Sequence, residues 1–584
     1  MKLWLHRLAM LIIIIVFLFL TVGSAKKESL TFDEIFNLQE GTTNITTRTF
    51  PIEPYNPPFV REIAVLPSVL GFTPLSGIPN QIYFLNRMII VVMAVILLWQ
   101  VMRTAHEYFG FWSSLLSGIL LALEPTFLAH SHYITPDIGL TLFTFMAYKA
   151  FLNVLISPTL TRYFFFGIFF GLACASKISA IPFLLLSTVI IFILKRKTFP
   201  MEWHMDHFGS ILFALVVAVF VIWTTYFFRF TPILVKHDNP ERLSNKILAY
   251  ANQRQLAVVS QGIQLLQGTP VPLGDYIGLL KNNLLRAQTP QRTFYAGTFH
   301  SNVSWYMTFD LLLKKLTLPF VFFLFAGIFL LITPEKILKY LITIEDRWKK
   351  NITEQEMLKK DEKKTMDEYQ NVPRYKIRVQ YEERMDKEWN YLFIVPIFSI
   401  FVVTIVTGMG PLIRYILPVF PFLAIVAGSS IQSLRSQWKK VLIVLCLFWY
   451  GYITLQAYPH FISYANEFIP QEKRYQYFID SNLDWGQGLI SLQTDYLSHR
   501  PSTLFLSYFG RDDAAMYGFS SNLLWGSYKN DEICAFHTIR NEAYTSGQET
   551  AISVSNWYNC GYYLQPEFSE SNIKRVVEDA ILIF

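Results

Sequence analysis

Long apolar runs, separated by shorter polar segments, follow one another along most of the chain. About 20 consecutive apolar residues are enough to cross a bilayer as a helix, and runs of roughly this length recur from the first residues to the middle of the chain. We therefore predict eleven membrane-spanning helices, at 8–25, 84–102, 109–129, 138–156, 162–180, 181–194, 208–228, 313–333, 390–409, 411–431 and 439–457.

Basic residues mark one side of this predicted bundle. The N-terminus and the short connections on its side carry Lys2, Arg7, Arg103, Arg162, Lys195 to Lys197 and Arg435 to Lys440. Because Lys and Arg concentrate in cytoplasmic loops, we expect a cytoplasmic N-terminus. The charged loop 334–389 is then also cytoplasmic, and its composition predicts a solvated helical or partly disordered insertion.

Composition agrees with an integral membrane protein. Of the 584 residues, 52% are hydrophobic and 16% aromatic, and the mean hydropathy is +0.33. These values are typical of polytopic membrane proteins. The net charge of +7 does not indicate a nucleic-acid partner, because the basic residues mostly mark topology. The first 25 residues also fit a cleavable signal peptide, although we favour an uncleaved helix.

The topology divides the chain into two domains. Residues 1–457 form a predicted transmembrane domain whose outer loops are 26–83 and 229–312, and 458–584 form a small extracytoplasmic α/β domain. Cys534 and Cys560 are the only cysteines outside the spans, and an extracytoplasmic compartment permits disulfides. We therefore predict that these two cysteines pair, whereas Cys174 and Cys446 pack within the membrane.

Ionisable residues gather at the outer ends of the predicted helices. Asp33 and Glu34 follow the first span, Glu124 to Asp137 follow the third, Lys177 lies between the fifth and sixth, and Arg414 begins the tenth. A transporter or flippase, the alternative function, should place such residues near the bilayer midplane. Their gathering at one interface favours an enzyme that works at the membrane surface.

The stretch TFDEIFNL, at residues 31–38, permits two interpretations. Thr31 and Glu34 have the spacing of a capping box, in which a hydroxyl and a carboxylate satisfy the free N–H groups at the start of a helix. Alternatively, Asp33 is a catalytic base at the membrane surface. This stretch alone does not decide between the two interpretations.

Transfer of a sugar from a polyprenyl phosphate is a reaction that suits these residues. A carboxylate would take the proton of the acceptor hydroxyl, and Lys or Arg would stabilise the anionic phosphate that leaves. The transition state has oxocarbenium character, and direct displacement inverts the anomeric centre. Asp33, Lys177 and Arg414 supply the required groups.

Several stretches, in order along residues 31–489, resemble glycosyltransferase family 39. They are TFDEIFNLQEG, YNPPFVREIAVLP, LEPTFLAHSHYITPDIGLTLF, GLACASKISAIPFLLL, SWYMTFDLLLKKLTLP, GPLIRYILPVFPFLAIVAG and YANEFIPQEKRYQYFIDSNLDWGQGL. The family comprises protein O-mannosyltransferase-like enzymes with the GT-C membrane fold. The resemblance implies a mainly α-helical GT-C bundle and an extracytoplasmic site.

The resemblance also implies roles for the acids and bases. Asp33 would be the base and Glu34 its usual neighbour, while Asp137 would occupy the second acidic position. Arg414, with Lys177, would contact the lipid phosphate. Each has a structural alternative: Asp137 could be a helix N-terminal acid favoured by the dipole, and Arg414 could extend to the membrane surface.

Other positions are candidates for substrate contact. His130 and His132 have a spacing that would also suit zinc, and Asn56 stands where family members often have His before Pro-Pro. This difference argues against a metal, so we expect neither a metal nor another cofactor. Asp484 and Trp485 belong to a polar cluster of the tail that either contacts a sugar-like acceptor or joins the tail to the membrane domain.

The sequence thus predicts an inverting hexosyltransferase of the plasma membrane. It would move a sugar, mannose-like by family resemblance, from a polyprenyl-phosphate donor to a hydroxyl of a protein, a glycan or a lipid at the outer face. A flippase for lipid-linked sugars is the main alternative. The other alternative is a scaffold protein without catalytic activity, in which Asp33 and Asp137 are dispensable.

Overall fold

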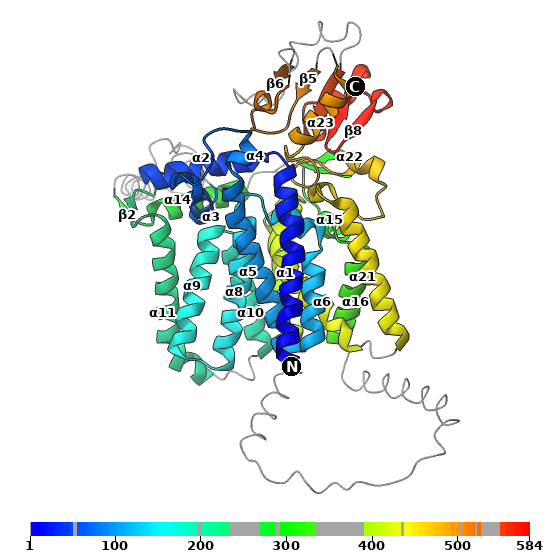
Figure 1. Cartoon of the computed structure of the whole chain (residues 1–584). Helices are drawn as coiled ribbons and strands as arrows, with labels where there is room; N and C mark the ends of the chain where they lie inside the picture. The colour runs from blue at the N-terminus through cyan, green and yellow to red at the C-terminus, as the bar shows by residue number, and fades with distance from the viewer. Residues whose placement is uncertain are drawn as a thin grey trace, which may run out of the picture.

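The structure of the chain is a computed structural model, and its overall arrangement is shown in Figure 1. It describes residues 2–50, 55–195, 201–233, 269–287, 292–332, 390–433, 437–501, 504–519, 523–526 and 549–584. The predicted cytoplasmic loop 334–389 and Cys534 lie outside these residues. The disulfide between Cys534 and Cys560 therefore stays a prediction.

A bundle of roughly parallel and antiparallel helices makes up most of the described chain (Figure 1). Six of these helices are long and apolar enough to cross a membrane, and a seventh span is added if α15 (Trp305–Lys315) and α16 (Leu318–Ile332), which are bent by 117°, count as one. The six are Trp4–Lys27 of α1 (Lys2–Lys27), α5 (Phe84–Phe109), α8 (Pro136–Ile156), His207–Thr225 of α11 (Met201–Thr225), Ile413–Gln432, and Lys440–Ala457 of α21 (Gln437–Ala457).

The remaining predicted spans fall on shorter apolar helices. These are α6 (Phe111–Ala122), α9 (Leu160–Ser176), α10 (Ala180–Lys195) and α19 (Ile394–Val406). The described helices therefore do not establish the predicted count of eleven spans. One physical reason is visible after α6, where Pro125 starts the separate short helix α7 (Pro125–His130) and so divides the apolar run, because proline fits the first turn of a new helix better than a helix interior.

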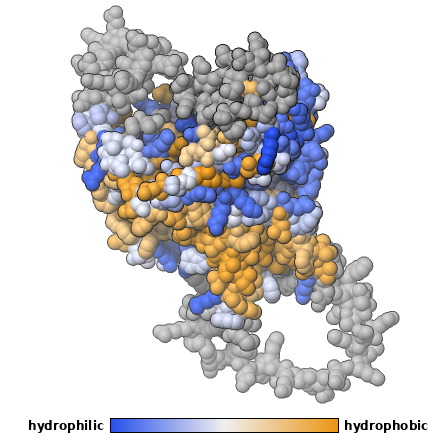
Figure 2. All heavy atoms as spheres, turned by 45° about the horizontal axis from the view of Figure 1, so that its top comes forward, coloured by the Kyte–Doolittle hydropathy of each residue, from blue (hydrophilic) through white to orange (hydrophobic). Residues whose placement is uncertain are grey.

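Apolar side chains cover the sides of the bundle. Figure 2 shows a broad hydrophobic zone around the helices below a more polar upper face. Phe19 on α1 and Phe448 on α21 are 70% and 74% exposed, as expected for side chains that face lipid. Large exposed apolar surfaces of this kind mark interaction with a membrane or a partner.

Small residues allow α9 and α11 to pack closely. A Cβ atom at Gly167 would lie 2.4 Å from the carbonyl oxygen of Ala214, and one at Gly171 would lie 2.8 Å from that of Ala218. A pair of glycines spaced by four residues lets two membrane helices approach backbone to backbone. This contact fixes α9, which ends immediately before Lys177.

Short helices lie across the upper end of the bundle in Figure 1. They are α2 (Phe32–Thr47), α3 (Phe59–Val69), α4 (Pro79–Ile82) and α14 (Gly274–Ala287). The N-terminus lies at the opposite end of the bundle. The acids that follow α1 are therefore carried to the end of the bundle that also holds the C-terminal part of the chain.

The C-terminal part contains a five-stranded sheet in the order β6-β5-β7-β9-β8. Its strands are β5 (Leu504–Ser507), β6 (Leu523–Gly526), β7 (Glu549–Ser553), β8 (Arg575–Val577) and β9 (Ile581–Ile583). Strand β5 is parallel to β6 and β7, whereas β9 is antiparallel to β7 and β8. Helices α23 (Leu489–His499) and α24 (Val554–Asn559) contact strands β8 and β7 of the sheet, respectively.

Backbone hydrogen bonds attach this sheet domain to the membrane domain. Ser29 N donates to Gln487 O at 3.0 Å, and Phe32 N donates to Trp485 O at 2.8 Å. The segment that leaves α1 therefore binds the chain that leads into the sheet. Because Asp33 directly follows this contact, the C-terminal domain helps to fix its position.

Candidate active site

The start of α2 separates the two acids of the TFDE stretch. Thr31 and Glu34 form a capping box, in which Thr31 N donates to Glu34 Oε2 at 2.8 Å. Glu34 is completely buried, whereas the Asp33 side chain is 33% exposed. The capping interpretation thus applies to Thr31 and Glu34, whereas the role of the partly exposed Asp33 as a base stays a prediction.

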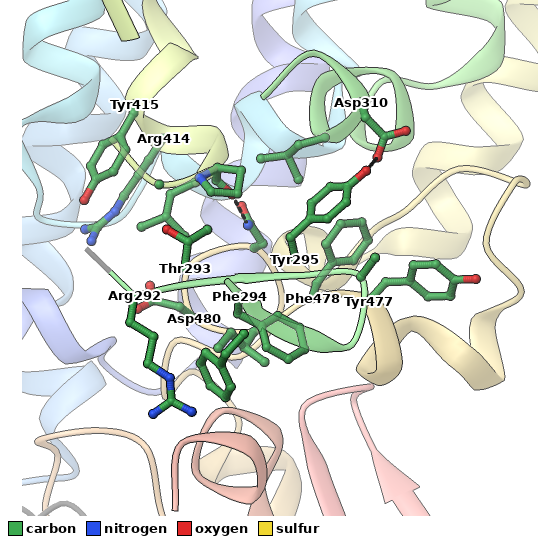
Figure 3. Close-up of a pocket in the computed structure, with 18 of the residues that line it drawn as sticks. Arg292, Thr293, Phe294, Tyr295, Asp310, Arg414, Tyr415, Tyr477, Phe478 and Asp480 are labelled. Carbon is green, nitrogen blue, oxygen red and sulfur yellow. Dashed lines mark hydrogen bonds between the residues drawn. The ribbon is translucent and has the colours of Figure 1, made fainter. Parts of the chain in front are cut away.

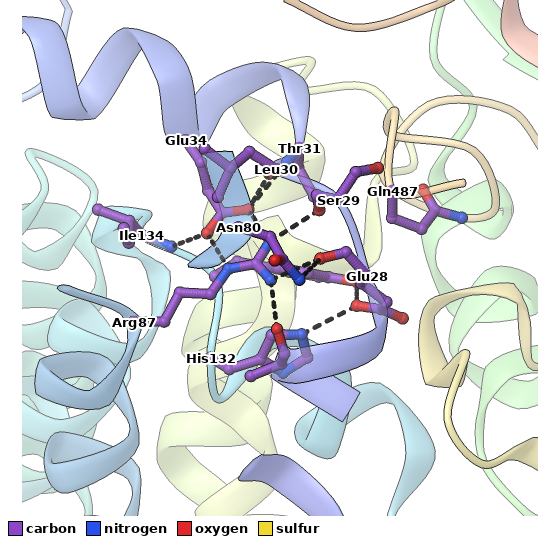
Figure 4. Close-up of polar contacts among 12 residues, drawn as sticks. Glu28, Ser29, Leu30, Thr31, Glu34, Asn80, Arg87, His132, Ile134 and Gln487 are labelled. Carbon is purple, nitrogen blue, oxygen red and sulfur yellow. Dashed lines mark hydrogen bonds and ion pairs between the residues drawn. The ribbon is translucent and has the colours of Figure 1, made fainter. Parts of the chain in front are cut away.

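Arg87 binds Glu34 from the neighbouring helix α5. Its Nε and Nη2 donate to the two Glu34 carboxylate oxygens at 2.8 and 2.7 Å, which is the bidentate geometry that suits guanidinium and carboxylate. Its remaining donors bind the carbonyl oxygens of Ala25, Glu28 and Ser29 at 2.8–2.9 Å (Figure 4). Both charged side chains are fully buried, so this pair clamps α2 to the end of α1.

A cavity of about 610 Å³ lies beside the clamped helix. Its lining includes four charged side chains that the sequence singled out, from four separate parts of the chain, namely Asp33, Asp137, Lys177 and Arg414. The predicted Asn56 also lines it. The apolar part of its lining, called the apolar flank below, consists of Ile178, Ile181, Pro182, Leu280, Leu284, Val403 and Met409.

Two ion pairs lie within this cavity. Arg414 Nη1 donates to Asp33 Oδ2, and Lys177 Nζ donates to Asp137 Oδ1 at 2.7 Å. Asp137 is 1% exposed, and among the described residues its other oxygen has no hydrogen-bond partner. Buried polar atoms are usually satisfied, so this oxygen is available to a ligand or a water.

Aromatic rings support the two cations. The Arg414 guanidinium lies 4.6 Å from the centroid of the Trp485 ring and 5.4 Å from that of Tyr415. The Lys177 ammonium lies 5.1 Å from the same Tyr415 ring. Cations over aromatic faces are attracted to the ring quadrupole. Tyr415 therefore bridges the two basic groups and keeps them at one side of the cavity.

Helix α14 closes the cavity with residues that the sequence analysis missed. Arg286 lines the cavity and lies 4.7 Å over the Tyr55 ring, while Asn283 Nδ2 donates to Tyr55 O at 2.8 Å. Asn37, one turn after Asp33, donates to Ile134 O at 3.0 Å. The amphipathic pattern GDYIGLLKNNLLRA predicts a helix at α14. No local pattern indicates that this helix faces the first outer loop.

Four other predicted residues are absent from the described lining of this cavity, and so is Glu34. They are His130, His132, Asp484 and Trp485. His132 Nε2 lies 2.9 Å from Glu28 Oε2, and the His130 ring meets the Trp485 ring edge-on at 6.0 Å. Both histidine rings contact the Tyr133 ring, at 6.0 Å for His130 and 4.3 Å for His132. In the described part of the chain, no group of three or more His, Cys, Asp or Glu side chains is arranged to hold a metal ion.

Asp484 makes its contacts within the tail, whereas Trp485 connects the tail to the membrane domain. Asp484 is buried and accepts a hydrogen bond from Ser555 N at 2.8 Å, and burial raises its pKa to about 7 despite the hydrogen bonds from Ser555. Trp485 is 1% exposed. Both alternatives for Asp484 therefore stay predictions, whereas Trp485 reaches the site through its contact with Arg414.

A second buried ionic cluster joins four segments that are distant in the sequence, the fourth being the turn of His132 and Tyr133. Glu28 Oε2 accepts from Tyr133 at 2.7 Å and lies 2.9 Å from His132, and its Oε1 lies 3.6 Å from His460 Nδ1. His460 Nε2 lies 2.8 Å from Glu578 Oε1. Glu28 and Glu578 are 0% and 6% exposed. The cluster therefore holds the end of α1, the end of α21 and the β8–β9 turn together.

The pKa values of this cluster are shifted strongly. Burial alone would raise the pKa of Glu28, but the hydrogen bonds from His132 and His460 lower it to about 2. Burial alone would lower the pKa of His460, but the hydrogen bonds to Glu28 and Glu578 raise it to about 10. Burial raises the pKa of Glu578 to about 7, against the effect of His460.

We expect the thermal stability of the protein to fall as the pH is raised above about 6.5. A raised pKa of His460 stabilises the folded state fully below its ordinary value of 6.5, and this contribution is lost as the pH approaches 10. Glu578 acts in the same direction between pH 4.5 and 7, while the contribution of Glu28 is lost only as the pH falls from 4.5 toward 2.

Melting temperatures of the detergent-solubilised protein from pH 5 to 10 would check this expectation. His460→Gln should remove most of the fall between pH 7 and 10, because Glu578 contributes only below about pH 7. His499→Gln, at a side chain that is 47% exposed, is the matched control and should keep the wild-type profile. A wild-type profile in His460→Gln would contradict the proposed role of the cluster.

Comparison with known proteins gives one match to a family. Residues 71–223 match the model described as dolichyl-phosphate-mannose-protein mannosyltransferase. This segment includes Asp137 and Lys177, whereas Asp33 and Arg414 lie outside it. No curated protein matches the chain.

Solved structures of membrane glycosyltransferases are similar at low identity. ArnT from Cupriavidus metallidurans in the apo state is 13% identical, with 98% of this chain and 97% of that chain covered and a TM-score of 0.47. AglB from Archaeoglobus fulgidus is 12% identical, with 97% and 71% covered and a TM-score of 0.48. The S. cerevisiae Pmt1-Pmt2 complex is 17% identical, with 40% and 37% covered and a TM-score of 0.33. The family match confirms, over residues 71–223, the resemblance to the protein O-mannosyltransferase-like enzymes of glycosyltransferase family 39 that the sequence predicted.

Proposed function

We propose that this chain is an inverting glycosyltransferase that moves a sugar from a polyprenyl-phosphate donor to a hydroxyl acceptor. The observation that carries the proposal is a single cavity in which Asp33 and Asp137 meet Arg414 and Lys177, beside an apolar flank. Carboxylates, cations and an apolar wall are the three features that an acceptor hydroxyl, a phosphate and a lipid chain require. The family match over residues 71–223 supports the same reaction class.

The donor would lie with its lipid along the apolar flank. Leu280, Leu284 and Val403 belong to that flank, and contact with them would remove apolar lipid surface from water. The phosphate would then meet Arg414 and Lys177, because charge-assisted hydrogen bonds to phosphate are among the strong polar interactions of proteins. The family match supports a mannose-like hexose as the sugar.

The reaction would be a single displacement. The acceptor oxygen forms a bond to the anomeric carbon, while the bond between that carbon and the phosphate oxygen breaks and its electron pair stays on the phosphate. Asp33 takes the acceptor proton. Arg414 and Lys177 stabilise the charge that develops on the leaving phosphate. Asp137, held by Lys177 at 2.7 Å, would position the sugar.

In this state of the molecule Arg414 is paired with Asp33. A bound phosphate would compete with Asp33 for the guanidinium, because Arg414 Nε has no hydrogen-bond partner among the described residues and can turn to a new acceptor. Binding of the donor would thereby release the Asp33 carboxylate for the acceptor hydroxyl. The base is thus kept in place by the same residue that receives the leaving group.

The proposed setting is the outer face of the plasma membrane. Helices α2 and α14, whose residues line the cavity, lie at the end of the bundle opposite the N-terminus (Figure 1), and the basic connections predict that the N-terminus is cytoplasmic. The C-terminal domain would then be extracytoplasmic. The acceptor would be a protein Ser or Thr, an envelope glycan or a lipid.

Label transfer from a panel of polyprenyl-phosphate sugars in reconstituted membranes tests the proposal. Wild type should move label from the lipid into a new product with host membrane extract as acceptor. Arg414→Gln should reduce this transfer by about ten- to a hundredfold, because hydrogen bonds to charged groups contribute roughly 1.5–3 kcal/mol.

Arg229→Gln is the matched control for this experiment. Arg229 pairs with Asp275 at 3.8 Å and is not among the residues that line the cavity, so its variant should transfer at the wild-type rate. Equal transfer by Arg414→Gln and wild type would contradict the phosphate role. Movement of the lipid-linked sugar across the membrane without a glycosylated product would favour the flippase instead.

A further inference from the structure

A second cavity, of about 290 Å³, adjoins the first at Arg286, Arg414 and Tyr415. Away from these shared residues, most of its lining comes from the hairpin of β3 (Thr293–Tyr295) and β4 (Thr298–His300), helix α15, residues 410–412 and the tail near residues 477–482. Figure 3 shows Arg414 and Tyr415 at one end of this cavity and Tyr295, Asp310 and Tyr477 at the other. The mechanism proposed for the first cavity uses none of the residues at this other end.

The far end holds a carboxylate between a phenol and an ammonium. Asp310 Oδ2 accepts from Tyr295 OH at 2.7 Å and from Lys314 Nζ at 2.6 Å. The Lys314 ammonium lies 5.6 Å from the centroid of the Tyr295 ring and 5.5 Å from that of Tyr477. These contacts fix the polar groups and present aromatic faces beside them.

Asp480 supplies a second carboxylate near the shared boundary. It lines the cavity and is close enough to Arg414 to interact electrostatically with its guanidinium. Its backbone has φ 53°, in the left-handed region that few residues other than Gly, Asn and Asp adopt. Its N donates to Ser555 Oγ at 2.9 Å, and its carbonyl accepts from Leu483 and Asp484 at 2.8 and 2.9 Å. The tail thus holds Asp480 in a left-handed conformation beside the site.

We propose that this second cavity binds the acceptor, that the acceptor is a saccharide, and that Asp480 orients its hydroxyls. The proposal rests on the function proposed above and names the acceptor class. The first cavity has the aliphatic flank that a polyprenyl chain needs, so the donor occupies it and the acceptor reaches Asp33 from the other side of Arg414. Asp33 and Asp480 then face the reaction from the two cavities.

The chemistry of the walls favours a sugar. A sugar ring has a C–H face that packs on aromatic rings and a rim of hydroxyls that donate to carboxylates, and the cavity offers Tyr295, Tyr477 and Phe478 together with Asp310 and Asp480. Its volume lies near the lower end of small-molecule pockets, which span about 300–1,000 Å³. An extended peptide would need a longer groove than this compact space.

Equilibrium binding to the detergent-solubilised full-length protein tests the proposal. The probes are neutral mono-, di- and trisaccharides, a Ser/Thr-rich peptide and a polyprenyl phosphate, each added alone. Wild type should bind at least one of the saccharides, and Asp480→Asn should weaken that binding at least tenfold with unchanged affinity for the polyprenyl phosphate. Asparagine also tolerates the left-handed backbone, so Asp480→Asn should fold.

Two further variants sharpen the result. Tyr295→Phe removes the hydroxyl that binds Asp310 and should also weaken saccharide binding. Glu472→Gln changes an exposed tail carboxylate that is not among the lining residues and should bind saccharide as wild type does. In transfer assays with a saccharide acceptor, Asp480→Asn should raise the KM for the acceptor at least tenfold without changing the KM for the donor.

Each remaining outcome separates this inference from the proposed function. If wild type transfers sugar but saccharide binding does not depend on Asp480, the inference about the acceptor is overturned and the proposed function stands. If saccharide binding depends on Asp480 but no sugar is transferred, the saccharide site stands and the proposed transferase function is contradicted. Binding of the peptide but of no saccharide would overturn the acceptor class.

Discussion

Asp33→Asn is expected to lower the kcat of sugar transfer by about 10²- to 10⁴-fold, the usual contribution of a positioned general base. The carboxylate lies in the large cavity beside Arg414 and is 33% exposed, so it can meet an acceptor hydroxyl. The amide of asparagine keeps the shape and one acceptor oxygen for Arg414 but cannot take the proton. Initial rates with a labelled polyprenyl-phosphate sugar would give kcat.

The affinity for polyprenyl phosphate separates a catalytic effect from a structural one. Asp33→Asn should bind this lipid at least as tightly as wild type, because the proposed phosphate ligands Arg414 and Lys177 remain and the carboxylate that competes for Arg414 has lost its charge. Glu472→Gln is again the matched control. Transfer by Asp33→Asn at the wild-type rate would reduce Asp33 to the partner of Arg414 and would remove the base from the proposed mechanism.

Arg87→Met is expected to lower the free energy of unfolding by about 3–5 kcal/mol, because removal of one partner leaves the other as an uncompensated buried charge. Arg87 and Glu34 are both completely buried. The substitution also removes the donors to the carbonyl oxygens of Ala25, Glu28 and Ser29. Chemical or thermal denaturation in detergent, followed by tryptophan fluorescence, would measure the loss.

A surface pair and a double variant make this prediction specific. Arg103 pairs with Glu107 at 2.9 Å, but their side chains are 55% and 38% exposed, so Arg103→Met should cost about 1 kcal/mol or less. Arg87→Met/Glu34→Leu should recover part of the stability lost in Arg87→Met, since no charge is then left unpaired. Equal losses in Arg87→Met and Arg103→Met would show that the buried clamp is unimportant.

Loss of the clamp should also reduce transfer, although neither residue lines the cavity. Glu34 fixes the first turn of α2 through Thr31 and Arg87, and it accepts a hydrogen bond from Ile134 N at 3.1 Å. Asp33 is the preceding residue, so its direction depends on these contacts. The effect on rate would thus arise from misplacement of the base, since small errors of geometry are costly in catalysis.

The sequence by itself determined where helices form and which acids follow them. Each predicted apolar run overlaps a helix, because about 20 apolar residues cannot be solvated by water and satisfy their backbone within a helix. The capping box at Thr31 and Glu34 and the start of α8 at Pro136 and Asp137 are equally local. Neighbouring residues decide such features, so they can be recognised without the fold.

Only the tertiary structure decided which of the two adjacent acids, Asp33 or Glu34, faces the cavity. Successive residues of a helix point about 100° apart, so Asp33 and Glu34 must face different directions. The choice between them depends on Arg87, which is 53 residues away, and on Arg414, which is 381 residues away. The contact of Trp485 with Arg414 and the closure by α14 also join distant segments. Such contacts arise from the packing of whole elements, and no local pattern in the sequence encodes them.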